Sequence, residues 1–264
     1  MIGAIIGDIA GSRFEWNNHR SREFEFFHPD CRCTDDSIMS IAVAKALTES
    51  DAEFTDLKEQ AVRWMREVGR RYPDGWYSRR FKAWLLSEDP QPYGANTNGS
   101  AMRVSACAYA ARSLEEAKRL SRAVTEITHS HDEGIKGAEA VTVAVYMART
   151  GSTREEIRAE MERSYYKLDF TLDGIRDSYA FDYTCEGSVP QALEAFFEST
   201  GLEDAIRGAI SIGGDSDTIA AIAGAIAGAY YGVPDELRQQ TLALMDDGMK
   251  EILAAFEERF MQEK

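Results

Sequence analysis

Two short acidic motifs, far apart in the chain, carry the residue types best suited to chemistry. In each motif, two aspartates and a threonine stand at the start of an apolar run, as "TDDSIMSIAVAKAL" and "DSDTIAAIAGAIAG" show. The six residues are Thr34, Asp35, Asp36, Asp215, Asp217 and Thr218. Asp and Thr often cap helices, but one cap needs only one side chain. Capping alone therefore explains the two motifs poorly when they are considered together.

A metal centre is the interpretation that best fits two acidic helix starts facing each other. Four mutually repelling carboxylates are costly to bring into a low-dielectric site. Two divalent cations would neutralise them, and hard oxygen ligands suit Mg²⁺ or Mn²⁺ better than zinc. An EF-hand is excluded, because the second motif lacks that loop's third ligand and distal glutamate. The pattern predicts a two-metal hydrolytic centre.

Three other segments allow both a functional and a structural interpretation. "NGSAMRVS", residues 98–105, opens an expected helix with small residues, either as a phosphate-binding start or as a plain one. "THSHDE", residues 128–133, resembles a metal motif, but the chain has only two other histidines, which disfavours histidine ligation. "YAFDYTC" supplies Tyr179, Phe181 and Tyr183, either as core aromatics or as a rim that stacks on a base.

The elements that must position these residues are helices. Apolar residues recur at spacings of three and four through most of the chain, and no alternating strand pattern extends beyond about five residues. The small-residue run 219–231 is expected to be a central core helix. Loops are expected at 17–33, 72–78, 88–99 and 170–187. No Gly/Ser or Pro linker divides the chain, so the sequence predicts one compact all-α domain over residues 1–264.

Net charge, cysteine spacing and apolar segments argue against several classes of protein. The net charge of −15 argues against a nucleic-acid surface and against an anionic membrane. Cys31 and Cys33 are one residue apart, which does not match zinc-ligand spacing, so free thiols are expected. The N-terminal segment carries Asp8 and no basic stretch, unlike a signal peptide. The run 219–231 is too short to span a bilayer. These features predict a cytoplasmic protein without membrane contact.

The chain resembles the ADP-ribosylglycohydrolase family, which includes the dinitrogenase reductase-activating glycohydrolase. The resemblance covers essentially the whole chain and rests on "GAIIGDIAGSRFE", "TDDS", "NGSAMRVS", "THSHDEGIKGA", "GSVPQAL" and "GGDSDTIAAIAGAIAGAYYG", in family order. It implies a compact orthogonal helical bundle around two Mg²⁺ or Mn²⁺ ions, with the six residues of the acidic motifs on the ligand positions. Among these ligands, Asp36 and Asp217 are also expected to be catalytic.

The resemblance also assigns residues outside the acidic motifs. Glu15 is expected to be catalytic on a mobile loop, with residues 16–33 as a lid, which is the pattern of the branch that hydrolyses serine-linked and poly(ADP-ribose) adducts. Asp8 is expected to be structural, Asp132 to cap a helix, and Arg103 to contact a phosphate or form a buried ion pair. The predicted ligand-binding residues are Asn98, Gly99, Ser100, Met102, His129 and Tyr183.

The sequence thus predicts a dinuclear-metal hydrolase that cleaves the C1″ bond of ADP-ribose adducts. Its expected partners are an ADP-ribosylated protein or small molecule and the product ADP-ribose, bound by a monomer. Arginine, serine, O-acetyl and poly(ADP-ribose) linkages all stay open as acceptors, with Glu15 favouring oxygen-linked ones. A catalytically inactive ADP-ribose binder and another metal-dependent phosphohydrolase are the alternatives.

Overall fold

The computed structural model describes residues 1–261, and this part of the chain is built from helices without a named strand. The α helices are α1 (Ile2–Gly11), α2 (Asp35–Glu49), α3 (Leu57–Arg71), α4 (Arg79–Leu86), α5 (Ser105–Ala110), α6 (Leu114–Thr125), α7 (Asp132–Arg149), α8 (Arg154–Ser164), α9 (Leu172–Ile175), α10 (Cys185–Phe197), α11 (Leu202–Ile210), α12 (Ser216–Tyr231), α13 (Asp235–Leu244) and α14 (Asp247–Phe260). Two 3₁₀ helices are η1 (Ser12–Phe14) and η2 (Asn98–Ser100). Every α helix contributes apolar side chains to one connected core. The all-α prediction is confirmed.

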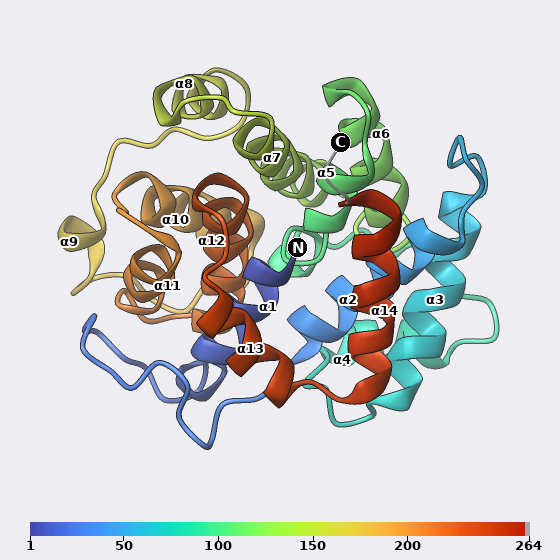
Figure 1. The fold of residues 1–264 in the computed structure, drawn as a ribbon, viewed down its shortest axis with the longest axis horizontal. Coiled ribbons are helices and arrows are strands. Elements are labelled where there is room, and N and C mark those ends of the chain that lie inside the picture. The colour runs from blue at the N-terminus through green and yellow to red at the C-terminus, as the bar shows by residue number, and fades with distance from the viewer. Residues whose placement is uncertain (262–264) are drawn as a thin grey trace.

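Helices α1 and α12 run side by side through the middle of the molecule (Figure 1). Glycines recur every four residues along one face of α1, so the two backbones can touch. A Cβ added at Gly7 would lie 2.0 Å from the Ala220 carbonyl oxygen, and one at Gly11 would lie 2.6 Å from the Asp217 Cα. This close approach places the end of α1 against the start of α12.

Helix α12 is the predicted central helix. Its residues from Ser216 to Ala227 are all buried, because small side chains let α1, α7, α10 and α11 pack closely around it. Helix α2 lies on the other side of α1 and packs against α3 and α14 (Figure 1). The two helices that carry the acidic motifs thus lie on either side of α1.

Two loops that are distant in the sequence are joined into a short antiparallel contact. Thr97 pairs with Thr184, the Asn98 N–H donates to the Tyr183 carbonyl (2.9 Å), and the Cys185 N–H donates to the Asn96 carbonyl (3.0 Å). This contact fixes the segment that precedes η2 against the segment that precedes α10. The expected loops 88–99 and 170–187 therefore form one joined surface.

Several predicted boundaries differ from the structure. Helix α10 begins at Cys185 and not at Ser188, because the Thr184 hydroxyl accepts a hydrogen bond from the Gly187 N–H and caps the helix earlier. The expected loop 170–187 also contains the short helix α9. The segment after Asn98 forms a 3₁₀ turn, and helix α5 starts only at Ser105.

Two expectations from composition concern the thiols and the membrane. All four cysteines are unpaired. None of the described helices combines the length and the apolar content that crossing a membrane requires.

Candidate functional site

The starts of α2 and α12 meet beside the end of α1, and their acids form two groups. One carboxylate oxygen each from Asp8, Asp36 and Asp217 lie within 4.8 Å of one another. The same holds for oxygens from Glu15, Asp215 and Asp217. Asp217 belongs to both groups, so it occupies the centre of the arrangement. Three separate parts of the chain supply these carboxylates.

The acids of this cluster have no basic partner within the described residues: none of them forms an ion pair with Lys or Arg. Asp36 Oδ1 and Glu15 Oε2 are buried and accept no hydrogen bond. Burial, followed by the charges of neighbouring acids, raises the pKa of Asp36 and of Asp217 well above the usual value. The cluster is an environment that favours either protons or bound cations.

The start of α2 is held by a carboxylate on the neighbouring helix. Asp8 accepts hydrogen bonds from the Thr34 N–H (3.0 Å), the Thr34 hydroxyl (2.6 Å), the Ser37 N–H (3.0 Å) and the Ser37 hydroxyl. Thr34 in turn caps α2 by accepting from the Asp36 N–H (3.3 Å). The structural role expected for Asp8 is confirmed, and its position within the acidic cluster follows from it.

The start of α12 depends on two glycines and on residues from other segments. Gly213 and Gly214 have φ values of +73° and +77°, a backbone region that side-chain-bearing residues rarely adopt. The Gly214 N–H donates to Asn18 Oδ1 (2.8 Å), and a Cβ at Gly214 would lie 2.4 Å from the Tyr179 ring. Asp215 accepts from the Asn98 amide (2.6 Å). The two glycines thus let the helix begin beneath packed side chains.

The remaining residues of the acidic motifs lie at the same place. The Thr218 hydroxyl donates to Asp36 Oδ2 (3.2 Å), which links the two helix starts directly. Asp35 is half-buried and lies outside both three-acid groups. Its pKa is raised well above the usual value by burial and then by the charges of Asp8 and Glu15. The aspartates of the two motifs are therefore close enough for the charge of one to raise the pKa of another.

Glu15 follows η1 and faces the cluster from the edge of the predicted lid. Burial, and then the negative charges of Asp215 and Asp8, raise the pKa of Glu15 to about 7. Its carboxyl group can therefore gain or lose a proton near neutral pH. A hydrogen bond with Asp217 acts in the opposite direction and lowers this pKa.

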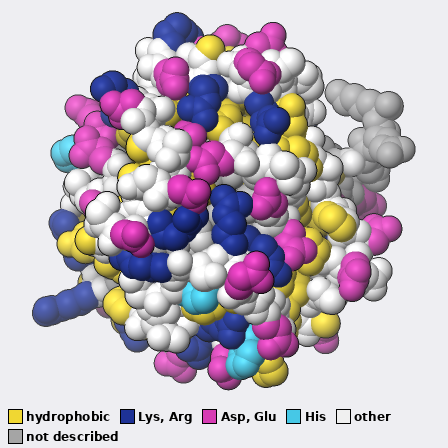
Figure 2. All heavy atoms as spheres, turned by 90° about the vertical axis from the view of Figure 1, so that its left-hand side faces the viewer, with side chains coloured by type: hydrophobic (Ala, Val, Ile, Leu, Met, Phe, Trp, Pro, Cys, Tyr) yellow, Lys and Arg dark blue, Asp and Glu magenta, His cyan; other side chains and the backbone are white. Residues whose placement is uncertain are grey.

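The segment 16–33 is fastened to the molecule at several points. Arg20 donates to the carbonyls of Tyr179 (2.5 Å), Ile212 (3.1 Å) and Arg176, and Arg22 pairs with Asp204 (2.8 Å). Figure 2 shows the face that carries this segment, where basic side chains gather among acidic ones. The segment holds Glu15 beside the carboxylates through these contacts.

The residues of the predicted ligand-binding turn 98–102 differ in their burial and in their hydrogen-bond partners. The Asn98 amide donates to both Ser188 Oγ (2.9 Å) and Asp215. Ser100 is buried and its hydroxyl donates to the Gly134 carbonyl (2.8 Å), so it supports the turn from behind. Met102 is also buried, whereas Gly99 lies against His129, with 3.4 Å between an added Cβ and Nε2.

His129 lies in a buried chain of hydrogen bonds. Its Nε2 is 2.9 Å from the Thr97 hydroxyl, and its Nδ1 is 2.7 Å from the Thr128 hydroxyl, which also accepts from Arg103 (2.7 Å). Burial, and then the charge of Arg103, lower the pKa of His129 well below the usual value. The ring is therefore neutral at neutral pH. The sequence analysis missed Thr97 and Thr128, although both lie within or next to the motifs it singled out.

The helix cap expected at Asp132 is wrong, and so is the ion-pair alternative for Arg103. Arg103 forms no ion pair with any described acid, because its buried guanidinium binds Thr128 and the Val124 carbonyl (3.5 Å) instead. Asp132 does not cap α7; the cap is His131, whose Nδ1 accepts from the Glu133 N–H (3.1 Å). Asp132 is the first residue of the helix itself.

Exposed aromatic rings stand beside Glu15. Trp16, Phe181 and Tyr183 are 74%, 43% and 59% exposed, so the core interpretation of the latter two is wrong. The Trp16 and Phe181 rings stack with centroids 5.6 Å apart, and Phe181 lies 6.4 Å from Tyr183. Tyr179 instead packs on Gly214 and donates to the Gly187 carbonyl (2.6 Å). Trp16, which the sequence analysis passed over, extends the row to the lid.

Comparison with known proteins places this arrangement in a family. The chain is 28% identical to ADP-ribosylarginine hydrolase Tri1 of Pseudomonas putida (strain GB-1), over 88% of this chain and 70% of that protein. It is 26% identical to ADP-ribosylhydrolase ARH3 of Mus musculus, over 90% of this chain and 85% of that protein. A solved structure described as an ADP-ribosylglycohydrolase-related protein complex shares the fold, with a TM-score of 0.68, 21% identity, and coverage of 97% of this chain and 94% of that one. The family profile described as ADP-ribosylglycohydrolase matches residues 1–264. The chain therefore belongs to the ADP-ribosylglycohydrolase family and is a hydrolase.

Proposed function

We propose that this protein hydrolyses the bond between C1″ of an ADP-ribose unit and an acceptor atom on a protein or small molecule. The observation that carries the proposal is the buried cluster of Glu15, Asp36, Asp215 and Asp217, which has no basic partner among the described residues. Departure of the acceptor leaves positive charge at C1″, and negative charge held nearby stabilises that transition state. The chain acts in this proposal as one domain and a monomer.

The residues of the cluster fit a divalent metal centre. They offer carboxylate and hydroxyl oxygens, and two buried carboxylate oxygens, one on Asp36 and one on Glu15, lack any hydrogen-bond donor. Such hard oxygen ligands suit Mg²⁺ or Mn²⁺. We assign the binding of two ions to Thr34, Asp35, Asp36, Asp215, Asp217 and Thr218. When bound, such ions supply charge neutralisation and polarise the reacting centre.

Glu15 is the proposed acid–base residue. Its pKa of about 7 allows the carboxyl group to accept a proton from an attacking water at the operating pH. Hydrogen bonds to Asp8, Asn98 and Asn18 hold the surrounding helix starts and glycine turn, so the carboxylates are positioned before a substrate arrives. Catalysis gains from such preorganisation, since the groups need not be rearranged during the reaction.

The ADP-ribose moiety is proposed to contact the turn 98–102 and the exposed aromatic row. Neutral His129 and Gly99 lie together at this turn, and Tyr183 sits on the loop paired with it. Exposed aromatic faces stack well on nucleobases. The relatives include both an ADP-ribosylarginine hydrolase and ADP-ribosylhydrolases. We propose that Glu15 makes oxygen-linked adducts the preferred substrates.

A panel of ADP-ribosyl adducts with arginine, serine, O-acetyl and polymeric linkages tests the proposal. We expect release of intact ADP-ribose with Mg²⁺ or Mn²⁺, and none with chelator. Glu15→Gln should lower kcat by about 10²–10⁴ with little change in KM. Glu25→Gln, an exposed acid on the same segment, is the matched control and should leave turnover unchanged. Release of AMP, or full activity with chelator, would contradict the proposal.

A further inference from the structure

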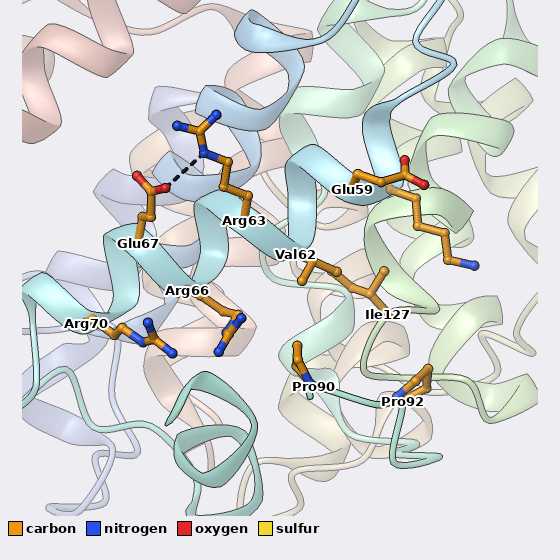
Figure 3. A pocket seen from close by; sticks show the side chains of 10 residues that line it. Glu59, Val62, Arg63, Arg66, Glu67, Arg70, Pro90, Pro92 and Ile127 are labelled. Carbon is orange, nitrogen blue, oxygen red and sulfur yellow. Dashed lines mark hydrogen bonds and ion pairs between the residues drawn. The ribbon is translucent and has the colours of Figure 1, made fainter. Parts of the chain in front are cut away.

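An open cavity of about 560 Å³ runs along one side of α3 and is lined by none of the residues of the candidate site (Figure 3). We call it the α3 groove. Its apolar walls are Val62 from α3, Pro90 and Pro92 from the loop after α4, and Ile127 from the turn just after α6. These side chains give the groove a surface on which apolar residues of a partner can pack.

The charge of the groove contrasts with that of the whole protein, whose net charge is −15. Lys58, Arg63, Arg66 and Arg70 line it, against two glutamates. Lys58 and Arg63 each pair with a nearby glutamate. Arg66 and Arg70 form no ion pair with any described acid, and burial and then the charge of Arg70 lower the pKa of Arg66. Arg66 and Arg70 are thus two adjacent positive charges without an ion-pair partner among the described residues, and the one unpaired acid in the lining, Glu59, lies toward the other end of the groove (Figure 3).

The two arginines are held in place while most of their donors stay available. Arg66 donates to the Leu85 carbonyl (3.3 Å) and to the Ser87 carbonyl, and Arg70 donates to the Leu85 carbonyl (2.9 Å). Each guanidinium has five N–H donors, so several on each remain for another acceptor. Figure 3 shows both side chains leaving the same side of α3. Fixing the side chains beforehand reduces the entropy lost when an anion binds.

The α3 groove is structurally continuous with the segment that carries His129. Ile127 lines the groove two residues before His129, and the Tyr93 N–H donates to the Thr128 carbonyl (3.1 Å). The Tyr93 ring lies 5.9 Å from the His129 ring. A second cavity, of about 310 Å³, shares Pro90 with the groove and includes Tyr93 in its lining. The groove therefore borders the segment that holds His129, one of the predicted ligand-binding residues.

We propose that the α3 groove binds an acidic, extended segment of the ADP-ribosylated protein on which the enzyme acts. This inference rests on the proposed function, because it names the macromolecular substrate of the same site. Arginine forks match carboxylates in geometry as well as charge, and the apolar walls suit intervening aliphatic side chains. Most of the surface of this negatively charged protein repels an acidic segment, so binding of that segment is confined to the groove.

Binding is tested directly with a short fluorescein-labelled peptide of alternating Glu and Leu, followed by fluorescence anisotropy. We expect saturable binding that weakens with added salt, and no binding of the matching uncharged peptide of alternating Gln and Leu. Arg70→Gln and Arg66→Gln should each weaken it about tenfold, the effect of one charge-assisted hydrogen bond. Arg71→Gln, an exposed arginine on the same helix that does not line the groove, is the control and should change it little. An equal loss in all three variants, or none in any, would overturn the proposal.

Turnover separates this inference from the proposed function. Arg70→Gln should lower kcat/KM about tenfold for an ADP-ribosylated acidic peptide and leave hydrolysis of a small-molecule adduct unchanged. Arg66 also caps the end of α4, so thermal unfolding of each variant is measured first, and Arg70→Gln, which loses one hydrogen bond, is the decisive variant. Equal losses of kcat/KM on both substrates would overturn the proposal that the groove binds the substrate protein. Absence of hydrolysis for every adduct would refute the proposed function, while peptide binding would still test the groove.

Discussion

The two acidic helix starts are nearly the same in composition and quite different in construction. At α2, Thr34 caps its own helix, and Asp8 binds Thr34 and Ser37 from the neighbouring helix α1. At α12 no side chain caps the helix, and two glycines with positive φ turn the chain into it. Asp215, the residue just before α12, instead accepts a hydrogen bond from the side chain of Asn98, which lies in a distant segment.

The difference shows that similar residues can reach one site by opposite routes. The α2 start depends on local hydrogen bonds that a capping threonine provides in many helices. The α12 start depends on close approach, because Asn18 and Tyr179 occupy the space that side chains at Gly213 and Gly214 would need. A substitution at the α2 start should therefore lower the free energy of unfolding less than one at the α12 start. Neither should affect hydrolysis as much as a substitution of Asp217, the acid shared by both three-acid groups.

The largest effect is expected at Asp217, the carboxylate that belongs to both three-acid groups. Asp217→Ala should lower hydrolysis below detection and remove the stabilisation that Mg²⁺ or Mn²⁺ confers, because one change disrupts both halves of the proposed centre. Activity assays and thermal unfolding with and without metal measure this. Asp235→Ala, an exposed acid in the first turn of α13, is the control and should leave both unchanged. Near-normal turnover in Asp217→Ala would remove the central role of this residue.

Gly214→Ala should be the most destabilising change at either helix start. Left-handed backbone costs a side-chain-bearing residue about 1–2 kcal/mol, and overpacking against Tyr179 adds about 1–3 kcal/mol. Gly94→Ala separates the two causes, since Gly94 also has positive φ (+63°) but has nothing within 4 Å of an added Cβ. Denaturant unfolding should show a distinctly larger loss for Gly214→Ala. Equal losses would mean that the packing beneath Tyr179 is unimportant.

Metal should stabilise the protein more at high pH than at low pH. Without metal, acids whose pKa is raised on folding, such as Glu15 at about 7, give stability at low pH that is lost as pH rises through the folded pKa. Cations bind the deprotonated carboxylates, so the gain should grow over the same window and reach about 2.7 kcal/mol at a hundredfold excess over Kd. Thermal unfolding with and without Mg²⁺ at about pH 5.5 and about pH 8 measures it. A gain independent of pH would contradict binding at these acids.

The smallest effect is expected at the cap of α2. Thr34→Ala should cost about 0.5–2 kcal/mol of unfolding free energy for the lost cap. It should cost about 0.5–1.5 kcal/mol more for the hydrogen bond that the hydroxyl donates to Asp8, which keeps three other donors. Thr153→Ala removes the equivalent cap of α8, far from the acids in the sequence, and is the matched control. Thr34→Ala should lose more stability than Thr153→Ala by the hydrogen bond to Asp8, and only Thr34→Ala should also reduce turnover. Identical turnover in the two would make Thr34 a cap and nothing more.

The sequence was enough to predict an all-α fold and the two acidic helix starts, because both depend on local residue patterns. Spacings of three and four residues define helices without reference to the rest of the chain, and the central helix 219–231 was identifiable from its small apolar residues alone. Capping was less predictable. Asp132 and His131 are both polar residues before an apolar run, and only the backbone geometry makes His131 the acceptor.

Only the tertiary structure decided which residues meet around the acids. Asn18, Asn98 and Tyr179 lie far from the α12 start in sequence, and their contacts with it depend on how three loops pack. The pairing of Arg103 with Thr128, in place of an acid, is likewise a matter of which neighbour burial brings near. Local spacing encodes a helix and its polar ends. Long-range packing alone determines which of those ends face one another, because it depends on the summed fit of many side chains.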